Sequence, residues 1–345
     1  MPEDRKEINI VSLVNSVPQI DTVRIGFLGD ISLNGRYRRK DYSFLDMVFC
    51  ELRQFISDKK VDFLIGNLES PLQGDGSENV LKRPRIKASK ESFHALRTLK
   101  PDILVLGNNH VFDCLDRGYD NTTNWLEANG IRHVGTFRKG DKTAGPFRFQ
   151  VKGQWFSLLS YVAEDTNPSL PDGADIQVNF MDPERMKKEI RSEARNAFVI
   201  VSLHWGIEFS HYPSPEQRIL AHGLIDAGAG IIMGHHTHTL QGIEKYKGGY
   251  IFYSLGNCAF DDVTDDESSV LWNRDQRHGG LGIADIIDRS RVSAELHVTV
   301  NKDLIVGIEK DEKWRKTVLK RSRVLREKEK EYQRFWLLYQ IADSM

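Results

Sequence analysis

The segment IIMGHHTH, residues 231–238, decides both the fold and the chemistry of this chain. Its apolar first half is typical of a buried strand, and its second half places three of the chain's 11 histidines within four residues. Four earlier apolar runs also end in polar residues: VRIGFLGD at Asp30, VDFLIGNLE at Glu69, PDILVLGNNH at His110 and AFVIVSLHWG around His204. Strands of this kind, separated by helical segments, predict an α/β layered fold with ligand-binding residues outside the carboxyl ends of the strands.

Helices are predicted between these strands, and glycine or proline marks several of their ends. The predicted helices cover residues 42–58, 90–100, 119–129, 183–194 and 215–227. Two later segments, GIEKYKGGYIFYSL at 242–255 and IADIIDRSRVSAELHVTV at 283–300, each contain two apolar runs around a turn and predict an antiparallel hairpin. The simplest fold that contains all these elements is a sandwich of two sheets flanked by helices.

The 345 residues are predicted to form one main domain with a segment at each end. Residues 1–22 are a polar lead, residues 23–300 form the layered domain, and residues 301–345 form a strand and an amphipathic helix packed on its body. The apolar stripe of this helix includes Trp314 and Tyr339. Packing against the core is the favoured interpretation, and contact with a partner or with a second copy in a homodimer is the alternative.

Charge and cysteine content limit the partners and the compartment. Lys and Arg number 48 against 49 Asp and Glu, so the net charge of −1 does not favour nucleic acid or an anionic membrane as a partner. The three scattered cysteines form no disulfide framework and fit a reducing compartment. The charged N-terminus lacks the apolar core of a signal peptide, and no apolar stretch reaches the length of about 18 residues that a membrane span needs. We therefore expect a cytoplasmic protein without a membrane span.

The polar residues at the strand ends form a candidate metal site. We expect the sheet edge to bring together eight side chains: Asp30, Glu69, Asn109, His110, His204, His235, His236 and His238. Oxygen and imidazole ligands without a thiolate select Mn, Fe or Zn, and this many candidates suit two divalent ions bridged by one carboxylate better than a single ion. His236 and His238 are expected on one side of an extended segment, where they can serve adjacent ions. A helix cap with surface histidines is the weaker alternative.

The residue after Asn109 is a candidate for acid catalysis. If Asn109 binds a metal ion, His110 can lie over the same site without binding one. This is the position of a general acid, and we interpret His110 as the catalytic residue. The alternative is a buried histidine that is hydrogen-bonded to Asp113.

Several motifs together resemble a known family. They are GDISL, NLESPL, GNNHVFDC, SLHWGIEF, the long stretch YPSPEQRILAHGLIDAGAGIIMGHHTHTLQGIE and IFYSLGN, and they span about residues 23–262. In these motifs the chain resembles the bacterial poly-gamma-glutamate capsule biosynthesis (CapA) family, a branch of the calcineurin-like metallophosphoesterase superfamily. The resemblance implies a four-layer α/β/β/α sandwich with a dinuclear metal site. The helical extension at the C-terminus adds to this sandwich.

The resemblance also implies which residues bind the ions. The implied ligands are the first-strand aspartate, the bridging carboxylate, an asparagine, the lone strand-end histidine and the terminal histidine pair: Asp30, Glu69, Asn109, His204, His236 and His238. His235 is an alternative member of the pair, and His110 corresponds to the acid. Two positions depart from the superfamily pattern, because Ser32 stands where a histidine is common and Glu69 replaces the usual aspartate. One metal position therefore has one imidazole fewer.

These features predict a metal-dependent hydrolase that acts on an anionic substrate, either poly-gamma-glutamate or a related polymer, or a phosphoester. Arg36, Arg83 and Arg85 lie in basic clusters after the first two strands, and with Glu208 of SLHWGIEF they are the candidate substrate-binding residues. A solvated surface is the alternative for the basic clusters. The alternative function is a non-catalytic accessory protein of capsule or cell-envelope polymer biosynthesis that retains the metal site, because such a protein tolerates the missing imidazole.

Overall fold

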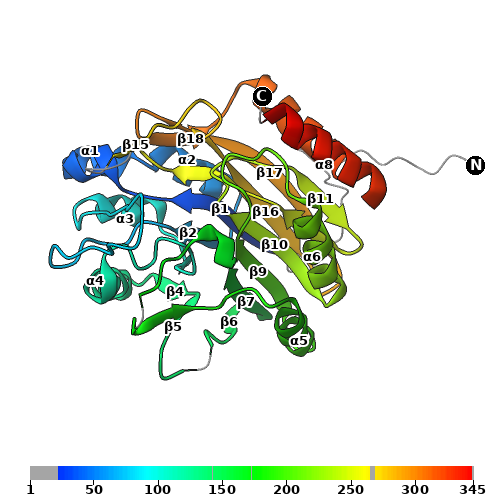
Figure 1. The fold of residues 1–345 in the computed structure, drawn as a ribbon, viewed down its shortest axis with the longest axis horizontal. Helices are drawn as coiled ribbons and strands as arrows, with labels where there is room; N and C mark the ends of the chain where they lie inside the picture. The colour runs from blue at the N-terminus through cyan, green and yellow to red at the C-terminus, as the bar shows by residue number, and fades with distance from the viewer. Residues whose placement is uncertain (1–21, 142, 172, 265–268, 344–345) are drawn as a thin grey trace, which may run out of the picture.

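The computed structural model describes residues 22–141, 143–171, 173–264 and 269–343. The predicted N-terminal lead, apart from Thr22, lies outside the described residues. Two β-sheets face each other in the middle of the molecule, and helices cover the outer face of each sheet (Figure 1).

The larger sheet has eight strands and mixes parallel and antiparallel pairing. Its central parallel strands come from the first part of the chain: β1 (Val23–Ile31), β2 (Phe63–Leu68), β3 (Ile103–Val105) and β4 (Arg132–Val134). Beyond β1 the sheet continues with antiparallel strands: β16 (His278–Ile286), β17 (Val292–Lys302) and β18 (Ile305–Ile308). The short strand β13 (Asn257–Ala259) pairs in parallel with the end of β1. The hairpin predicted at 283–300 is confirmed as β16 and β17.

The smaller sheet has six strands. Across the sheet they are β11 (Ile243–Tyr246), β12 (Gly249–Phe252), β10 (Ala229–His235), β9 (Phe198–His204), β7 (Gln154–Val162) and β6 (Phe147–Val151). The hairpin predicted at 242–255 is confirmed as β11 and β12. Two further pairs of short strands lie outside both sheets: β5 (Thr136–Arg138) with β8 (Ile176–Val178), and β14 (Val263–Thr264) with β15 (Ser269–Val270).

Helices cover both outer faces, and Figure 1 shows the two groups on opposite sides of the sheets. The larger sheet is covered by α1 (Tyr42–Met47), α2 (Cys50–Asp58), α3 (Ala95–Leu99) and α4 (Leu115–Ala128). The smaller sheet is covered by α5 (Pro183–Glu193) and α6 (Pro215–Asp226). Short 3-10 helices occur at η1 (Gly35–Arg39), η2 (Ser92–His94) and η3 (Glu164–Thr166).

The helix predicted at 42–58 forms as two helices, α1 and α2, and the break has a tertiary cause. The carbonyl of Val48 accepts a hydrogen bond of 2.8 Å from the backbone N–H of Val306 in β18. An uninterrupted helix would use this carbonyl for its own i to i+4 bond. The interruption therefore depends on a strand that lies far away in the sequence.

Three apolar layers separate the four layers of secondary structure. Phe27 of β1 and Phe252 of β12 are fully buried between the two sheets. Leu28, the next residue of β1, points the other way and is buried under the helices of the larger sheet. Leu224 of α6 is buried against the smaller sheet. The apolar strand runs are thus buried on both faces, and the predicted α/β/β/α order is confirmed.

The C-terminal part starts differently from the sequence prediction. The expected boundary at residue 300 falls inside β17, and after β18 the chain forms two helices, α7 (Glu312–Val324) and α8 (Glu329–Asp343), where one was expected. Trp314 of α7 is buried with the inter-sheet core, and Tyr332 of α8 is buried with the core of the smaller sheet. None of the described helices combines the length and the apolar character needed to cross a membrane.

The ends of the parallel strands bring the predicted site residues to one edge of the sandwich. Asp30 of β1 pairs in register with Asn67 of β2 in the larger sheet. His235 of β10 pairs in register with His204 of β9 in the smaller sheet. Because both pairs lie at carboxyl ends, the two sheets present polar residues to each other where the apolar core stops.

The inter-sheet core gives a test of this arrangement. Ile231→Ala removes a side chain that is 0% exposed, and we expect it to lower the free energy of unfolding by about 2–5 kcal/mol because a cavity remains between the sheets. Ile219→Ala on α6, where the side chain is 50% exposed, is the matched control and should change stability by less than about 1 kcal/mol. Urea denaturation measures both variants, and equal losses would contradict the placement of Ile231.

Candidate metal centre

Asp30 is fully buried at the end of β1 and accepts three hydrogen bonds. Its Oδ1 accepts from Asn67 Nδ2 at 2.8 Å and lies 2.9 Å from His235 Nδ1. Its Oδ2 accepts from the backbone N–H of His236 at 3.1 Å. Burial alone would raise the pKa of Asp30, but the hydrogen bond and charge of His235, with His238 and Asn67, lower it below its ordinary value. Asp30 is therefore held as a carboxylate.

The pKa of Glu69, directly after β2, is shifted in the opposite direction from that of Asp30. Its side chain is 0% exposed, and neither carboxylate oxygen has a hydrogen-bond partner among the described residues. Burial, together with the charges of Asp30 and Glu208, raises the pKa of Glu69 well above its ordinary value. An unpaired carboxylate in this position costs free energy unless a cation or a proton compensates it.

Three imidazole nitrogens converge on this carboxylate. The Nε2 atoms of His238, His204 and His110 lie 3.8, 3.9 and 4.0 Å from Glu69 Oε1. These separations are too long for hydrogen bonds, but two ligands that each lie about 2.1 Å from one zinc ion can be this far apart. Ligand atoms of Asp30, Glu69 and His238 lie within 4.8 Å of one another. The donor set therefore fits a divalent cation.

The histidine segment itself differs from the sequence prediction. β10 ends at His235, and the residues after it do not continue as an extended strand. His236 and His238 have φ angles of +88° and +54°, in a region that L-residues rarely adopt. The rings of His236 and His204 nevertheless lie 4.9 Å apart between centroids, so a strained loop brings them to the site. Backbone strain of this kind persists where the surrounding structure holds it in place.

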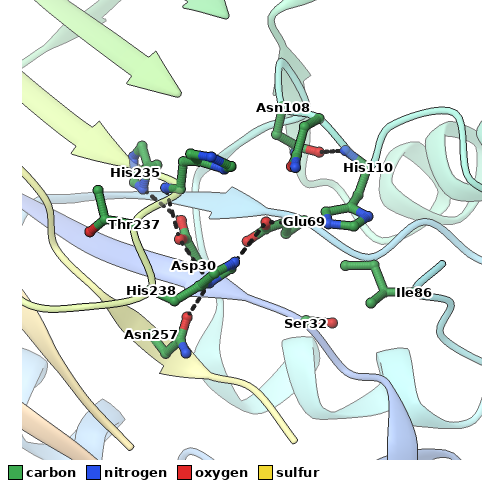
Figure 2. Close-up of polar contacts among 12 residues, drawn as sticks. Asp30, Ser32, Glu69, Ile86, Asn108, His110, His235, Thr237, His238 and Asn257 are labelled. Atoms are coloured by element: carbon green, nitrogen blue, oxygen red, sulfur yellow. Dashed lines mark hydrogen bonds and ion pairs between the residues drawn. The ribbon is translucent and has the colours of Figure 1, made fainter. Parts of the chain in front are cut away.

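Neighbouring amides orient two of the imidazoles. Asn257 Nδ2 donates to the carbonyl of Gln276, so its Oδ1 is the acceptor that lies 2.9 Å from His238 Nδ1. This bond places the hydrogen of His238 on Nδ1. The lone pair of Nε2 is then free to bind a cation beside Glu69. Asn109 Oδ1 lies 2.9 Å from His204 Nε2, the ring nitrogen that also faces Glu69, so these two predicted ligands are adjacent. Figure 2 shows His235, His238 and Asn257 around Asp30, with Glu69 between His238 and His110.

His235 and Ser32 are placed differently from the ligand candidates. His235 uses Nδ1 for the contact with Asp30, which suits a residue that orients the carboxylate. Ser32 is fully buried, and its hydroxyl donates to Asn34 Oδ1 at 3.0 Å. Figure 2 shows Ser32 apart from the imidazoles, so its side chain does not replace the missing histidine.

His110 forms a buried pair with Asp113. His110 Nδ1 lies 2.7 Å from Asp113 Oδ2, which also accepts from the backbone N–H of Ile86 at 2.7 Å. Burial lowers the pKa of His110 and raises the pKa of Asp113. Both shifts favour a neutral imidazole and a neutral carboxyl group over a charged pair.

A pocket of about 430 Å³ opens over these residues. Its walls include His110, His236, His238 and two of the four predicted substrate-binding residues, Arg83 and Glu208. The other two, Arg36 and Arg85, line a neighbouring cavity of about 590 Å³. There Arg36 pairs with Asp261 at 2.7 Å, and Arg85 pairs with Glu78 at 3.2 Å. The structure thus divides the predicted cationic residues between two adjacent cavities.

Two residues that complete the site, Asn67 and Asn257, received no role from the sequence. Asp113 was expected only in the alternative in which it is hydrogen-bonded to a buried His110, and this contact is present. Lys82 belongs to the basic cluster after the second strand, but it was not among the candidate substrate-binding residues. Asn67 and Asn257 lie at strand ends like the predicted ligands, and this was an available signal. The basic cluster did not distinguish Lys82 from its neighbouring cations, because all of them lie in one long loop between β2 and η2.

Comparisons with known proteins decide the family. Residues 24–262 match the family described as "Bacterial capsule synthesis protein PGA_cap". The chain belongs to this family. The resemblance to CapA proteins is confirmed by relatives: the capsule biosynthesis protein CapA of Bacillus anthracis is 30% identical over 252 residues, 70% of this chain and 61% of that protein. The PGA biosynthesis protein CapA of Bacillus subtilis is 30% identical over 268 residues, 76% of this chain and 70% of that protein.

The chain spans about three fifths of the length of the B. anthracis relative. Among solved structures, the NAD nucleotidase NadN of Haemophilus influenzae is similar with 11% identity and a TM-score of 0.43, over 87% of this chain and 55% of that chain.

The metal centre leads to a direct test. After reconstitution with Mn²⁺ or Zn²⁺ we expect the wild-type chain to hold up to two ions, and Glu69→Gln to hold fewer, because the amide keeps the size of the side chain but loses its charge. Glu78→Gln is the matched control, since Glu78 pairs with Arg85 and Lys87 in the neighbouring cavity. Elemental analysis measures the ions. A wild type without metal, or a fully loaded Glu69→Gln variant, would contradict the centre.

Glu69 also predicts a pH dependence for the metal-free protein. Its pKa in the folded state lies above the ordinary value of 4.5, so between these two values the folded state holds a proton that the unfolded state has released. Stability that depends on this group therefore falls as the pH rises through that interval. We expect wild type to lose stability relative to Glu69→Gln above about pH 4.5, measured by denaturation in the presence of a chelator. A difference between the two proteins that stays constant with pH would contradict this.

Proposed function

We propose that this chain is a metal-dependent hydrolase of an anionic substrate, either poly-gamma-glutamate or a related polymer, or a phosphoester, with a dinuclear centre. The observation that carries the proposal is the fully buried Glu69 carboxylate, which lacks a hydrogen-bond partner among the described residues and is faced by imidazole nitrogens at 3.8–4.0 Å. The two CapA relatives are named for capsule and PGA biosynthesis, which supports the polymer as substrate.

The proposed ligands lie on both sheets of the sandwich, with Glu69 as the bridge. They are Asp30, Glu69, Asn109, His204, His236 and His238. Divalent ions such as Mn, Fe or Zn supply Lewis acidity and a hydroxide nucleophile at neutral pH. We assign His235 a positioning role, because its Nδ1 contacts Asp30.

His110 is the proposed acid, and Asp113 explains how a neutral imidazole can act as one. With the proton of the pair on Asp113, the remaining imidazole hydrogen is on Nε2, which lies 4.0 Å from Glu69 Oε1. As Nε2 gives its proton to the leaving group, the proton of Asp113 can pass to Nδ1 across 2.7 Å. The imidazole then stays neutral throughout, which suits its buried position.

The substrate would enter the pocket beside Arg83 and Glu208. Ile86 and Val263 border both this pocket and the neighbouring cavity that contains Arg36 and Arg85. An anionic chain that extends from the metal centre would therefore meet further cationic groups. We place the protein in the cytoplasm, in agreement with its three free cysteines. We also propose that it forms a homodimer.

One observation favours a second candidate function. Ser32 donates to Asn34 and supplies no imidazole to the centre, so one metal position has a weaker ligand set than in typical phosphoesterases. A non-catalytic accessory protein of capsule polymer biosynthesis could retain such a centre for binding.

Turnover separates the two candidates. We expect His110→Ala to keep its metal content and to lose about 10²-fold or more in turnover of poly-gamma-glutamate or of a phosphodiester, because general acids contribute about that much. His133→Ala, which removes an imidazole paired with Glu127, is the control and should keep full activity. If His110→Ala loses metal as far as His204→Ala does, His110 is a ligand and not the acid. A metal-loaded wild type that turns over neither substrate would favour the accessory function.

A further inference from the structure

Lys82 is a buried cation in the wall of the metal pocket. It lies in the loop between β2 and α3, is 3% exposed and shares the pocket lining with His110, Glu208 and His236. Lysine is almost never buried to this extent unless a partner compensates its charge. The sequence places Lys82 in a basic cluster but does not single it out as a substrate-binding residue, and the proposed ligand set assigns no role to it.

The ammonium group of Lys82 has unused hydrogen-bonding capacity. Its Nζ donates to the backbone carbonyl of Asn167 at 2.7 Å, and this is its one side-chain hydrogen bond among the described residues. An ammonium group has three N–H donors, so two remain for a group inside the pocket. No carboxylate of the described residues comes within ion-pair distance of it. Asp113, Glu69 and Glu208 are the acidic groups that act on Lys82 from further away when they are ionised.

A purely structural role explains little of this placement. The contact with Asn167 joins two loops, but another bond already joins the same two: Asn79 Nδ2 donates to the carbonyl of Ser169 at 2.7 Å. The loop of Lys82 is also held from another side, because the backbone N–H of Ile86 donates to Asp113 at 2.7 Å. A neutral side chain of similar length would fill the same space without the cost of burying a charge. The cation is therefore best explained by an anionic ligand.

We propose that Lys82 binds an anionic oxygen of the substrate in the metal pocket and so selects substrates with a carboxylate or phosphoryl group beside the bond that reacts. The inference rests on the proposed function of this pocket. Lys82 Nζ would donate its two free N–H groups to this oxygen, while Asn167 holds the third. The ligand is thus an anion small enough to reach between Lys82 and the imidazoles of His110 and His236.

Equilibrium binding to the metal-loaded full chain tests Lys82 separately from turnover. The probes are inorganic phosphate and glutarate, titrated by calorimetry against wild type, Lys82→Met and Lys87→Met. Methionine keeps the length of the side chain and removes the charge. Lys87 is the matched control because it pairs with Glu78 beside the neighbouring cavity. We expect Lys82→Met to bind at least one probe about tenfold or more weakly, because hydrogen bonds to charged groups typically contribute that much to affinity. Lys87→Met should bind both probes with the affinity of wild type.

Metal content and thermal stability complete the test. We expect Lys82→Met to hold the same ions and to melt at the same or a higher temperature, because it no longer buries an unpaired charge. The probe that loses more affinity identifies the anion as a phosphoryl group or a carboxylate. If the variant binds both probes as wild type does, if wild type binds neither, or if the variant melts lower without losing affinity, the proposal is wrong. If the variant binds the probes more weakly but the wild type hydrolyses no substrate, the anion-binding role of Lys82 is supported and the proposed hydrolase activity is rejected.

Discussion

The Glu69 carboxylate is buried without a hydrogen-bond partner in the part of the chain that the structure describes, and the rest of the site depends on this constraint. A charge in this position is tolerated only when positive charge, a proton or an ion compensates it. The chain meets this requirement by ending strands of two different sheets beside it, so that imidazoles from β9 and from the loop after β10 face a carboxylate from β2. The Glu69 side chain is fully buried, and the low local polarity strengthens each of these interactions.

Fixed amides and a strained loop hold the groups in place. Asn67 and His235 fix Asp30, and Asn257 fixes the ring of His238. The left-handed backbone at His236 and His238 costs free energy in itself. It persists because the backbone N–H of His236 is bound to Asp30. Backbone and side-chain contacts therefore support each other at the one place where the donor atoms must converge.

The C-terminal helix α8 lies outside the residues matched by the family and contacts a loop that borders the pocket. Tyr332 of α8 donates to the carbonyl of Pro213, and the backbone N–H of His211 donates to the hydroxyl of Tyr339. Both contacts hold the loop that follows β9 and carries Glu208 to the pocket wall. Figure 1 shows α8 lying along the edge of the molecule beside α6. This extension is thus part of the support for the pocket rather than an independent segment.

The sequence by itself determined the strands, the layer order and the group of ligand types at strand ends, because burial on both faces and polar termini leave a local pattern at Asp30, Glu69 and His204. It did not determine the break at Val48, the left-handed loop at His236, or the separation of Arg36 and Arg85 from the metal pocket. Arg85 is held in the neighbouring cavity by Glu78 of the same loop. The other features depend on a partner far away in the sequence: Val306 for the helix break, Asp30 for the left-handed loop and Asp261 for Arg36. Lys82 entered the pocket for the same reason, since only the packed loops show which of several neighbouring cations is buried.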